Sequence, residues 1–118
     1  MLRALIVDDD PVTKRFLAEI LAPFAVCELA ANDREGLDAF ARALSDAKPY
    51  DVIFIDVMMP AMDGHQALEA MRHLEHEQHV GPADAAKVIM VSAVDDSRNV
   101  YRAFFQGQAL SFLPKPFT

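Results

Sequence analysis

Short apolar segments that run into acidic residues, alternating with segments of helical periodicity, constrain the fold of this chain more than any other feature. Residues 2–7 are apolar apart from one arginine and lead directly into Asp8-Asp9-Asp10, and residues 51–55 lead into Asp56. Such short, largely continuous apolar runs are typical of strands that are buried on both faces of a parallel sheet. Strands are expected at residues 2–7, 25–29, 51–55, 88–91 and 110–113.

Four helices are expected between these strands. Asp10 before Pro11 is a typical helix start, and Asn32 followed by Glu35 resembles a capping box. The polar segment 75–86 contains Gly81-Pro82 and predicts a frayed helix end and a loop. The predicted apolar stripes are Val12, Phe16, Leu17, Ile20 and Leu21; Leu37, Phe40, Ala41 and Leu44; Ala67, Leu68, Met71 and Leu74; and, in a helix at 96–106, Val100, Tyr101, Phe104 and Phe105.

Strands that alternate with helices predict one α/β domain over residues 1–118, a doubly wound parallel sheet covered by helices on both faces. Ligands of such sheets bind beyond the carboxyl ends of the strands. Five polar side chains are expected near these ends: Asp8, Asp9, Asp56, Ser92 and Lys115. The sequence therefore predicts a single site at this edge.

Three carboxylates at one edge repel one another unless a cation lies between them. Mg²⁺ prefers oxygen ligands and is commonly held by one or two carboxylates together with phosphate. A metal, an attacking carboxylate and a lysine are a set of groups that suits phosphoryl transfer. A nearby hydroxyl that binds the new phosphoryl group can convert the chemistry into a conformational change.

Composition excludes other classes of function. The formal net charge of -7 argues against a nucleic-acid-binding protein, which needs clustered basic residues. No apolar run approaches the roughly 20 residues that span a membrane, and the N-terminus does not resemble a secretory signal. Cys27 is the single cysteine, so no internal disulfide can form, and a reducing cytoplasm is the expected setting.

Several short motifs together resemble the receiver domains of two-component response regulators, along essentially the whole chain. The matching residues are Val7-Asp8-Asp9, Asp56, Pro60, Asp63-Gly64, Ser92-Ala93 and Leu113-Pro114-Lys115-Pro116-Phe117. The resemblance implies a flavodoxin-like sheet of strand order 2-1-3-4-5. It also implies Mg²⁺ or Mn²⁺ as cofactor and a phosphohistidine donor on a histidine kinase or a histidine phosphotransfer protein.

The resemblance assigns a role to each matching position. Asp56 is the implied phosphoacceptor, and the domain is expected to catalyse only its own phosphorylation and dephosphorylation. For the metal, the resemblance implies direct ligands from Asp9, Asp56 and the backbone carbonyl of Met58, and a ligand through water from Asp8. It also implies that Lys115 contacts the phosphate and that Ser92 and Phe112 are the conformational switch.

Two features depart from the family pattern. Met58 and Val94 are apolar at the two positions that tune the lifetime of the phosphoryl group, which predicts slow hydrolysis. The chain also ends at Thr118, where the family usually has a fifth helix. We therefore expect either a longer protein, with an output domain after Thr118, or an exposed apolar patch that pairs two copies as a homodimer.

Plainer interpretations compete at some positions. Asp10 is expected to be only a helix cap, Asp63-Gly64 mostly a turn, and Cys27 a small buried hydrophobe. His73, His76 and His79 form either a transition-metal site or, as we prefer, a solvated polar face.

Three other functions stay open for the chain as a whole. The first is a receiver-like interaction module that is never phosphorylated. The second is a phosphatase of the haloacid dehalogenase type, although its nucleophile should follow the first strand. The third is a flavin-binding module, although no loop here is rich in the Ser, Thr and Gly that contact phosphate.

Overall fold

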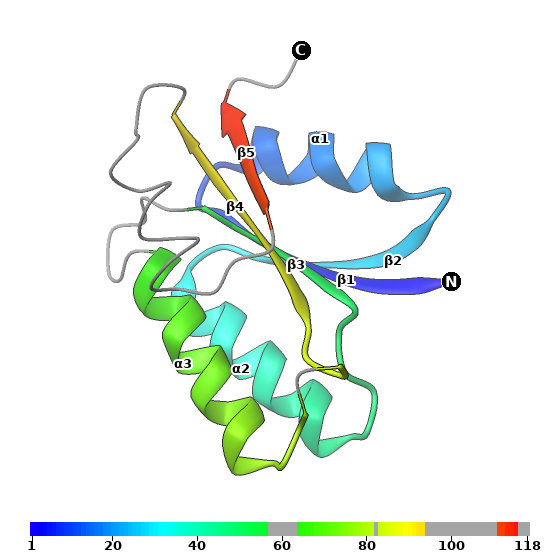
Figure 1. Cartoon of the computed structure of the whole chain (residues 1–118). Helices are drawn as coiled ribbons and strands as arrows, with labels where there is room; N and C mark the ends of the chain where they lie inside the picture. The colour runs from blue at the N-terminus through cyan, green and yellow to red at the C-terminus, as the bar shows by residue number, and fades with distance from the viewer. Residues whose placement is uncertain (57–63, 82, 94–110, 116–118) are drawn as a thin grey trace.

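The computed structural model of the chain describes residues 1–56, 64–81, 83–93 and 111–115. These ranges contain five strands and three helices, which alternate from the N-terminus as far as β4 (Figure 1). The elements are β1 (Leu2–Val7), α1 (Pro11–Leu21), β2 (Ala25–Ala30), α2 (Asp33–Ser45), β3 (Val52–Asp56), α3 (Gly64–Glu77), β4 (Lys87–Ala93) and β5 (Ser111–Lys115). The helix predicted at 96–106 lies outside the described residues.

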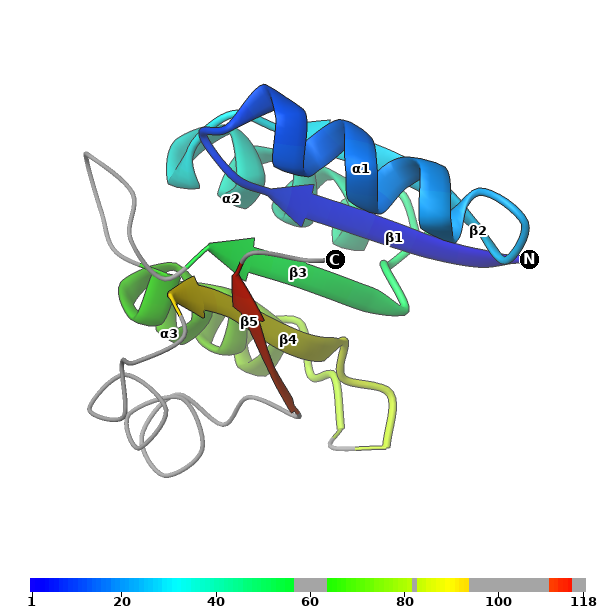
Figure 2. The same ribbon diagram turned by 90° about the horizontal axis from the view of Figure 1, so that it is seen from above.

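The strands form one parallel sheet in the order β2-β1-β3-β4-β5. This is the predicted α/β fold with the predicted strand order. In the views of Figures 1 and 2, α2 and α3 lie together on one face of the sheet, and α1 lies on the other. No helix in the described part of the chain is long and apolar enough to cross a membrane.

Three strands continue further than predicted, which changes where the polar residues lie. Asp56, Ser92 and Lys115 were expected just past their strands, but they belong to β3, β4 and β5. The strands extend because parallel pairing continues to these ends: Asp56 pairs with Val91, and Lys115 pairs with Ala93. A polar side chain does not interrupt a ladder that only backbone groups form.

The larger part of the core lies between the sheet and the helices α2 and α3. Strand residues such as Leu5, Ile53 and Val88 are fully buried there, together with Phe40 of α2 and Leu68 of α3. The other predicted stripe residues of these two helices are also at least partly buried, namely Leu37, Ala41, Leu44, Ala67, Met71 and Leu74. The predicted inward faces of α2 and α3 are therefore confirmed.

Helix α2 approaches the end of β1 very closely at Gly36. A Cβ atom added to Gly36 would lie 2.8 Å from Cγ2 of Val7, closer than real Cβ atoms come to their neighbours. A glycine at this position lets the helix pack directly against the strand that precedes Asp8.

Helix α1 buries much less of its apolar surface than predicted. Leu17 is buried in a small cluster with Ile6, Phe54 and Val91 on this face of the sheet. Two members of the predicted stripe, Val12 and Ile20, are instead 74% and 52% exposed, and Phe16 is 39% exposed. The apolar residues of α1 cover too wide an arc for all of them to face the sheet once Leu17 and Leu21 do.

Cys27 packs at the border of the same small cluster, half-buried rather than buried as predicted. It lies in β2, which is an edge strand of the sheet, so its side chain has neighbours on one side only. Burial nevertheless raises the pKa of its thiol above the ordinary value.

The segment 75–86 contains the predicted connection between α3 and β4, but its predicted frayed helix end is wrong. The helix continues to Glu77, and Glu75 is buried with 4% of its surface exposed. Its Oε1 atom lies 2.8 Å from Nη1 of Arg72, and its Oε2 atom accepts a hydrogen bond of 2.8 Å from the backbone N–H of Ala86. A buried acid with these partners fixes the helix end instead of loosening it.

His73, His76 and His79 are exposed, the first two on α3 and the third just after it. Nε2 of His73 lies 2.7 Å from Oε1 of Glu77, on an exposed part of α3. His79 follows the helix in a left-handed conformation with φ of 60°. In the described part of the chain, the one group of side chains close enough together to hold a metal ion lies at the carboxyl ends of β1 and β3.

Candidate functional site

Asp8, Asp9 and Asp56 come together at the carboxyl edge of the sheet. Each contributes one carboxylate oxygen, and these three oxygens all lie within 4.8 Å of one another. We call this group the acid cluster. The structure thus brings together the three acids that the sequence predicted to form one site.

The pairing of the two central strands places these acids. Val7 of β1 pairs with Ile55 of β3, so the next residues along the two strands, Asp8 and Asp56, are neighbours. The backbone N–H of Asp8 also donates a hydrogen bond of 3.1 Å to the carbonyl of Ala30 at the end of β2. The ends of three parallel strands therefore hold the backbone of the site.

The three acids differ in their contact with solvent. Asp8 and Asp56 are buried, with 1% and 5% of their surfaces exposed, whereas Asp9 is exposed. Charged side chains are rarely buried unless they are paired or bind a metal. Two acids of the cluster are therefore buried, and the third is open to solvent.

A short hydrogen-bonded turn connects the cluster to α1. Oδ1 of Asp8 accepts a 2.9 Å hydrogen bond from the backbone N–H of Asp10. Asp10 in turn caps the helix: its Oδ1 accepts from the N–H of Val12 at 3.0 Å, and its Oδ2 accepts from the hydroxyl of Thr13 at 2.7 Å. The prediction that Asp10 serves as a cap is confirmed.

The donor set of the acid cluster fits a hard divalent cation. Mg²⁺ binds carboxylate oxygens at about 2.1 Å, so oxygens on opposite sides of one ion are about 4 Å apart. The 4.8 Å limit within the cluster is close to this span. Three like charges this near one another also gain from a cation between them. Asp8, Asp9 and Asp56 therefore have the chemistry and the spacing to hold Mg²⁺.

Ser92 and Lys115 lie at the same edge of the sheet at the level of the backbone. Ser92 follows Val91, which pairs with Asp56, and Lys115 pairs with Ala93. Phe112 lies three residues earlier in β5, opposite Met90. The positions of these strands agree with the predicted site, while the directions of these three side chains stay predictions. Met58 and Val94 lie outside the described residues.

Asp33 is a buried acid near the same edge that the sequence did not single out. It is the first residue of α2, directly after the cap Asn32, and only 4% of its surface is exposed. A negative charge in the first turn of a helix is favoured by the helix dipole. That position was the one signal in the sequence. Oδ1 of Asp33 is buried and has no hydrogen-bond partner among the described residues.

Comparison with known proteins supports one family. The family profile described as "Response regulator receiver domain" matches residues 4–118. The transcriptional regulatory protein PcoR of Escherichia coli is 34% identical over 118 residues, which are 99% of this chain and 46% of PcoR. The chemotaxis protein CheY of Listeria monocytogenes is 34% identical over 117 residues, which are 99% of this chain and 88% of CheY.

Solved structures agree with the sequence comparison. The receiver domain of the histidine kinase CKI1 from Arabidopsis thaliana, crystallised in complex with Mg²⁺ and BeF3⁻, matches with a TM-score of 0.82 and 26% identity. The match covers 97% of this chain and 80% of that one. The chain spans less than half the length of PcoR. A profile match over nearly all residues, on this strand order, shows that the chain belongs to the response regulator receiver domain family of two-component signalling.

Proposed function

We propose that Asp56 is the phosphoacceptor of this receiver domain. The donor is a phosphohistidine on a histidine kinase or on a histidine phosphotransfer protein. The observation that carries this proposal is the acid cluster, in which Asp56 lies at the end of β3 within 4.8 Å of two further carboxylates. The chain acts on no separate substrate and catalyses only the gain and loss of its own phosphoryl group.

In the proposed reaction a carboxylate oxygen of Asp56 attacks the phosphorus atom in line. The new O–P bond forms as the N–P bond of the phosphohistidine breaks, and the released imidazole regains its proton from solvent. Lys115 is the last residue of β5, which pairs with β4. Its ammonium group is proposed to lie against the phosphoryl oxygens. The domain thus contributes the nucleophile, its orientation and one compensating charge.

The acid cluster is the proposed site for Mg²⁺ or Mn²⁺. Asp9 and Asp56 would bind the ion directly, Asp8 through a water molecule, and the backbone carbonyl of Met58 would complete the protein ligands. When bound, the ion neutralises charge that develops on the transferred phosphoryl group. The complex of the CKI1 receiver domain with Mg²⁺ supports this assignment.

Ser92 and Phe112 are the proposed switch. Ser92 lies in β4 beside the position of Asp56 in the sheet, and its hydroxyl would bind the new phosphoryl group. Phe112, in the adjacent β5, would follow that movement. The apolar Met58 and Val94 are proposed to slow hydrolysis, so the variants Met58→Asn and Val94→Glu should lose phosphate faster. Unchanged rates of loss would contradict the role of these two residues.

The test of the proposed function is phosphorylation by a small donor. We expect acetyl phosphate with Mg²⁺ to add one phosphoryl group to the purified chain, observed by intact mass spectrometry. Asp56→Asn should abolish the addition. Asp51→Asn is the matched control because Asp51 precedes the same strand at its other end. A wild-type chain that gains no phosphate would favour an interaction module that is never phosphorylated. An Asp56→Asn variant that gains as much as wild type would place the phosphoacceptor at another residue.

A further inference from the structure

Helix α2 carries a fourth buried acid at the carboxyl edge of the sheet. Only 4% of the surface of Asp33 is exposed, and its buried Oδ1 atom accepts no hydrogen bond in the described part of the chain. A buried carboxylate is costly unless a donor or a cation compensates it. The dipole of α2 favours an acid in its first turn but does not require a buried one, since Glu35 in the same turn is exposed. The burial of Asp33 therefore needs a further cause.

The packing of α2 shows which way the Asp33 side chain points. The buried residues of this helix are Asp33, Gly36, Phe40 and Ala43, and their spacing places them on one face. Phe40 and Ala43 belong to the core between this helix and the sheet. The Cα–Cβ bonds of a helix also lean towards its N-terminus, which for α2 follows the carboxyl end of β2. Asp33 therefore points towards the sheet and towards its carboxyl edge.

The close contact between Gly36 and Val7 gives the level of Asp33 along β1. A Cβ atom on Gly36 would lie 2.8 Å from Cγ2 of Val7, so these two residues are side by side. From there α2 and β1 run in opposite directions, because α2 leads from the carboxyl end of β2 back to the start of β3. Asp33 precedes Gly36 by about 4.5 Å along the helix. Asp8 follows Val7 by about 3.3 Å along the strand. Asp33 thus lies beside the strand end that carries Asp8 and Asp9.

We infer that Asp33 strengthens cation binding by the acid cluster without being a direct ligand. The inference rests on the proposed function, in which the acid cluster holds Mg²⁺. Protein-bound Mg²⁺ keeps several waters, which can donate hydrogen bonds, and an ionised carboxylate only accepts them. Oδ1 of Asp33 is an acceptor of this kind on the α2 side of the cluster. Asp33 is thus a positioning residue, because it acts through bound water and not on the phosphoryl group.

The charge of Asp33 acts in the same direction as its hydrogen-bonding capacity. Without a cation, a fourth acid adds to the repulsion within the acid cluster, whereas with a cation it adds attraction. Residues that contact a metal site from outside its direct ligands typically change metal affinity by about ten- to hundredfold. We expect the contribution of Asp33 to lie at the lower end of this range.

The first test is the affinity of the 118-residue chain for Mg²⁺, from titration of its backbone amide NMR signals with MgCl₂ at constant ionic strength. Asp33→Asn should weaken binding by about tenfold. Asp38→Asn is the matched control, because it removes the same charge from an exposed position of the same helix. It should change the affinity by less than about twofold, since solvent and salt screen an exposed charge.

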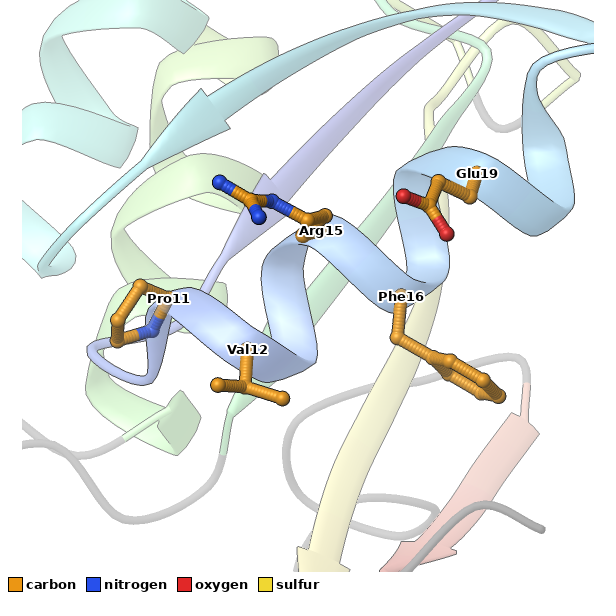
Figure 3. A pocket seen from close by; sticks show the side chains of 5 residues that line it. All are labelled: Pro11, Val12, Arg15, Phe16 and Glu19. Carbon is orange, nitrogen blue, oxygen red and sulfur yellow. The ribbon is translucent and has the colours of Figure 1, made fainter.

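Glu19→Gln is a second control, for the face of the sheet that carries α1. The exposed groove along this helix has a volume of about 330 Å³ and is lined by Pro11, Val12, Arg15, Phe16 and Glu19 (Figure 3). Glu19 is eight residues after Pro11, which is about 12 Å further along the helix from the acid cluster. Its neutralisation should also leave Mg²⁺ affinity within about twofold of wild type.

Thermal unfolding gives a second readout that a purely structural role of Asp33 would not move. Without Mg²⁺, Asp33→Asn should raise the unfolding midpoint, because it removes a buried charge near three others. A given concentration of Mg²⁺ should then raise the midpoint of this variant less than that of wild type. Asp33→Ala, which leaves no buried amide group, should lose the same part of the Mg²⁺-dependent increase.

The outcomes separate this inference from the proposed function. If wild type binds Mg²⁺ and is phosphorylated on Asp56, but Asp33→Asn binds Mg²⁺ as tightly, Asp33 serves the fold alone and only the inference fails. Equal weakening in Asp33→Asn and Asp38→Asn would show a general effect of net charge and would also overturn it. A wild-type chain that binds no Mg²⁺ would overturn the inference together with the proposed cation site.

Discussion

The two ends of the central strands use acidic residues in opposite ways. At the carboxyl end, Asp8, Asp9 and Asp56 face one another within 4.8 Å. Towards the other end, where β1, β3 and β4 begin, three acids lie against donors of the protein itself: Glu28, Asp51 and Glu75. Glu28 accepts a 2.6 Å hydrogen bond from the hydroxyl of Tyr50, and Asp51 accepts one of 2.8 Å from the N–H of Arg3.

We call these the acid end and the paired end of the sheet. Cations complete the paired end: Arg3 lies 3.5 Å from Glu28 and over the ring of Tyr50 at 5.4 Å, and Arg72 contacts Glu75. An acid that is matched by donors stabilises the fold, whereas acids gathered together raise the energy of the folded chain until a cation binds. The difference indicates that the paired end maintains the structure, while the acid end is the proposed site of chemistry.

The largest expected effect is at the paired end. Glu75→Ala should lower the free energy of unfolding by about 3 kcal/mol, because it leaves the buried N–H group of Ala86 without its acceptor and removes the carboxylate that pairs with the partly buried Arg72. Urea denaturation measures this loss. Glu77→Ala is the control, since its contact with His73 is exposed and should be worth less than about 1 kcal/mol. Equal losses in the two variants would show that Glu75 does not fix the start of β4.

A smaller effect of opposite sign is expected at the acid end. Without Mg²⁺ and at low salt, Asp9→Asn should raise the free energy of unfolding by up to about 1 kcal/mol, because it removes one of three neighbouring like charges. Mg²⁺ that binds the folded wild-type chain should raise its free energy of unfolding. In Asp9→Asn this increase should be smaller or absent.

Glu28→Gln provides the comparison for Asp9→Asn. It neutralises an acid at the paired end and should lower stability, whether or not Mg²⁺ is present, because Arg3 and Tyr50 lose a charged partner. Thermal unfolding of the three proteins with and without Mg²⁺ separates the cases. If both substitutions destabilise the chain without Mg²⁺, the distinction between the two ends fails.

The smallest effect concerns the dependence of stability on alkaline pH. Burial, together with the hydrogen bond to Glu28, raises the pKa of Tyr50 above the ordinary value of 10.0. The folded chain therefore keeps the phenol neutral where the unfolded chain loses its proton. Its contribution to stability is complete below about pH 10 and is lost as the pH rises from there towards the raised pKa.

Tyr50→Phe checks this contribution because it removes the titrating group and keeps the ring. The fall in unfolding free energy above about pH 10 should be less steep in the variant, by at most about 1.4 kcal/mol per pH unit. Urea denaturation at a series of pH values measures both slopes. Identical slopes would mean that Tyr50 ionises equally in the folded and unfolded chains.

The sheet and the acid cluster could be predicted because both follow from local patterns. Apolar runs specify buried parallel strands, and the pairing of Val7 with Ile55 then brings Asp8 and Asp56 together. The boundaries were less accurate, since Asp56 and Ser92 are part of their strands. A hydropathy pattern ends at the first polar residue, but a backbone ladder does not.

Two features could not be predicted because they depend on distant partners. Glu75 is buried by virtue of a backbone N–H eleven residues later in the chain, and nothing in the polar segment around it indicates this contact. The spacing of Val12 and Ile20 predicts an apolar helix face, but it does not show which part of that face the sheet covers. The side-chain directions of Ser92, Phe112 and Lys115 stay predictions.

Two consecutive hydrogen bonds join the acid cluster to the first turn of α1. Asp10 donates to Asp8 through its backbone N–H and accepts from Val12 through its side chain. An event that shifts Asp8 therefore reaches the first turn of α1 with no intervening flexible segment. If a bound cation alters how tightly α1 binds any partner, thermodynamic reciprocity requires that the partner alter cation affinity by the same factor. Measuring either equilibrium then reports on the other.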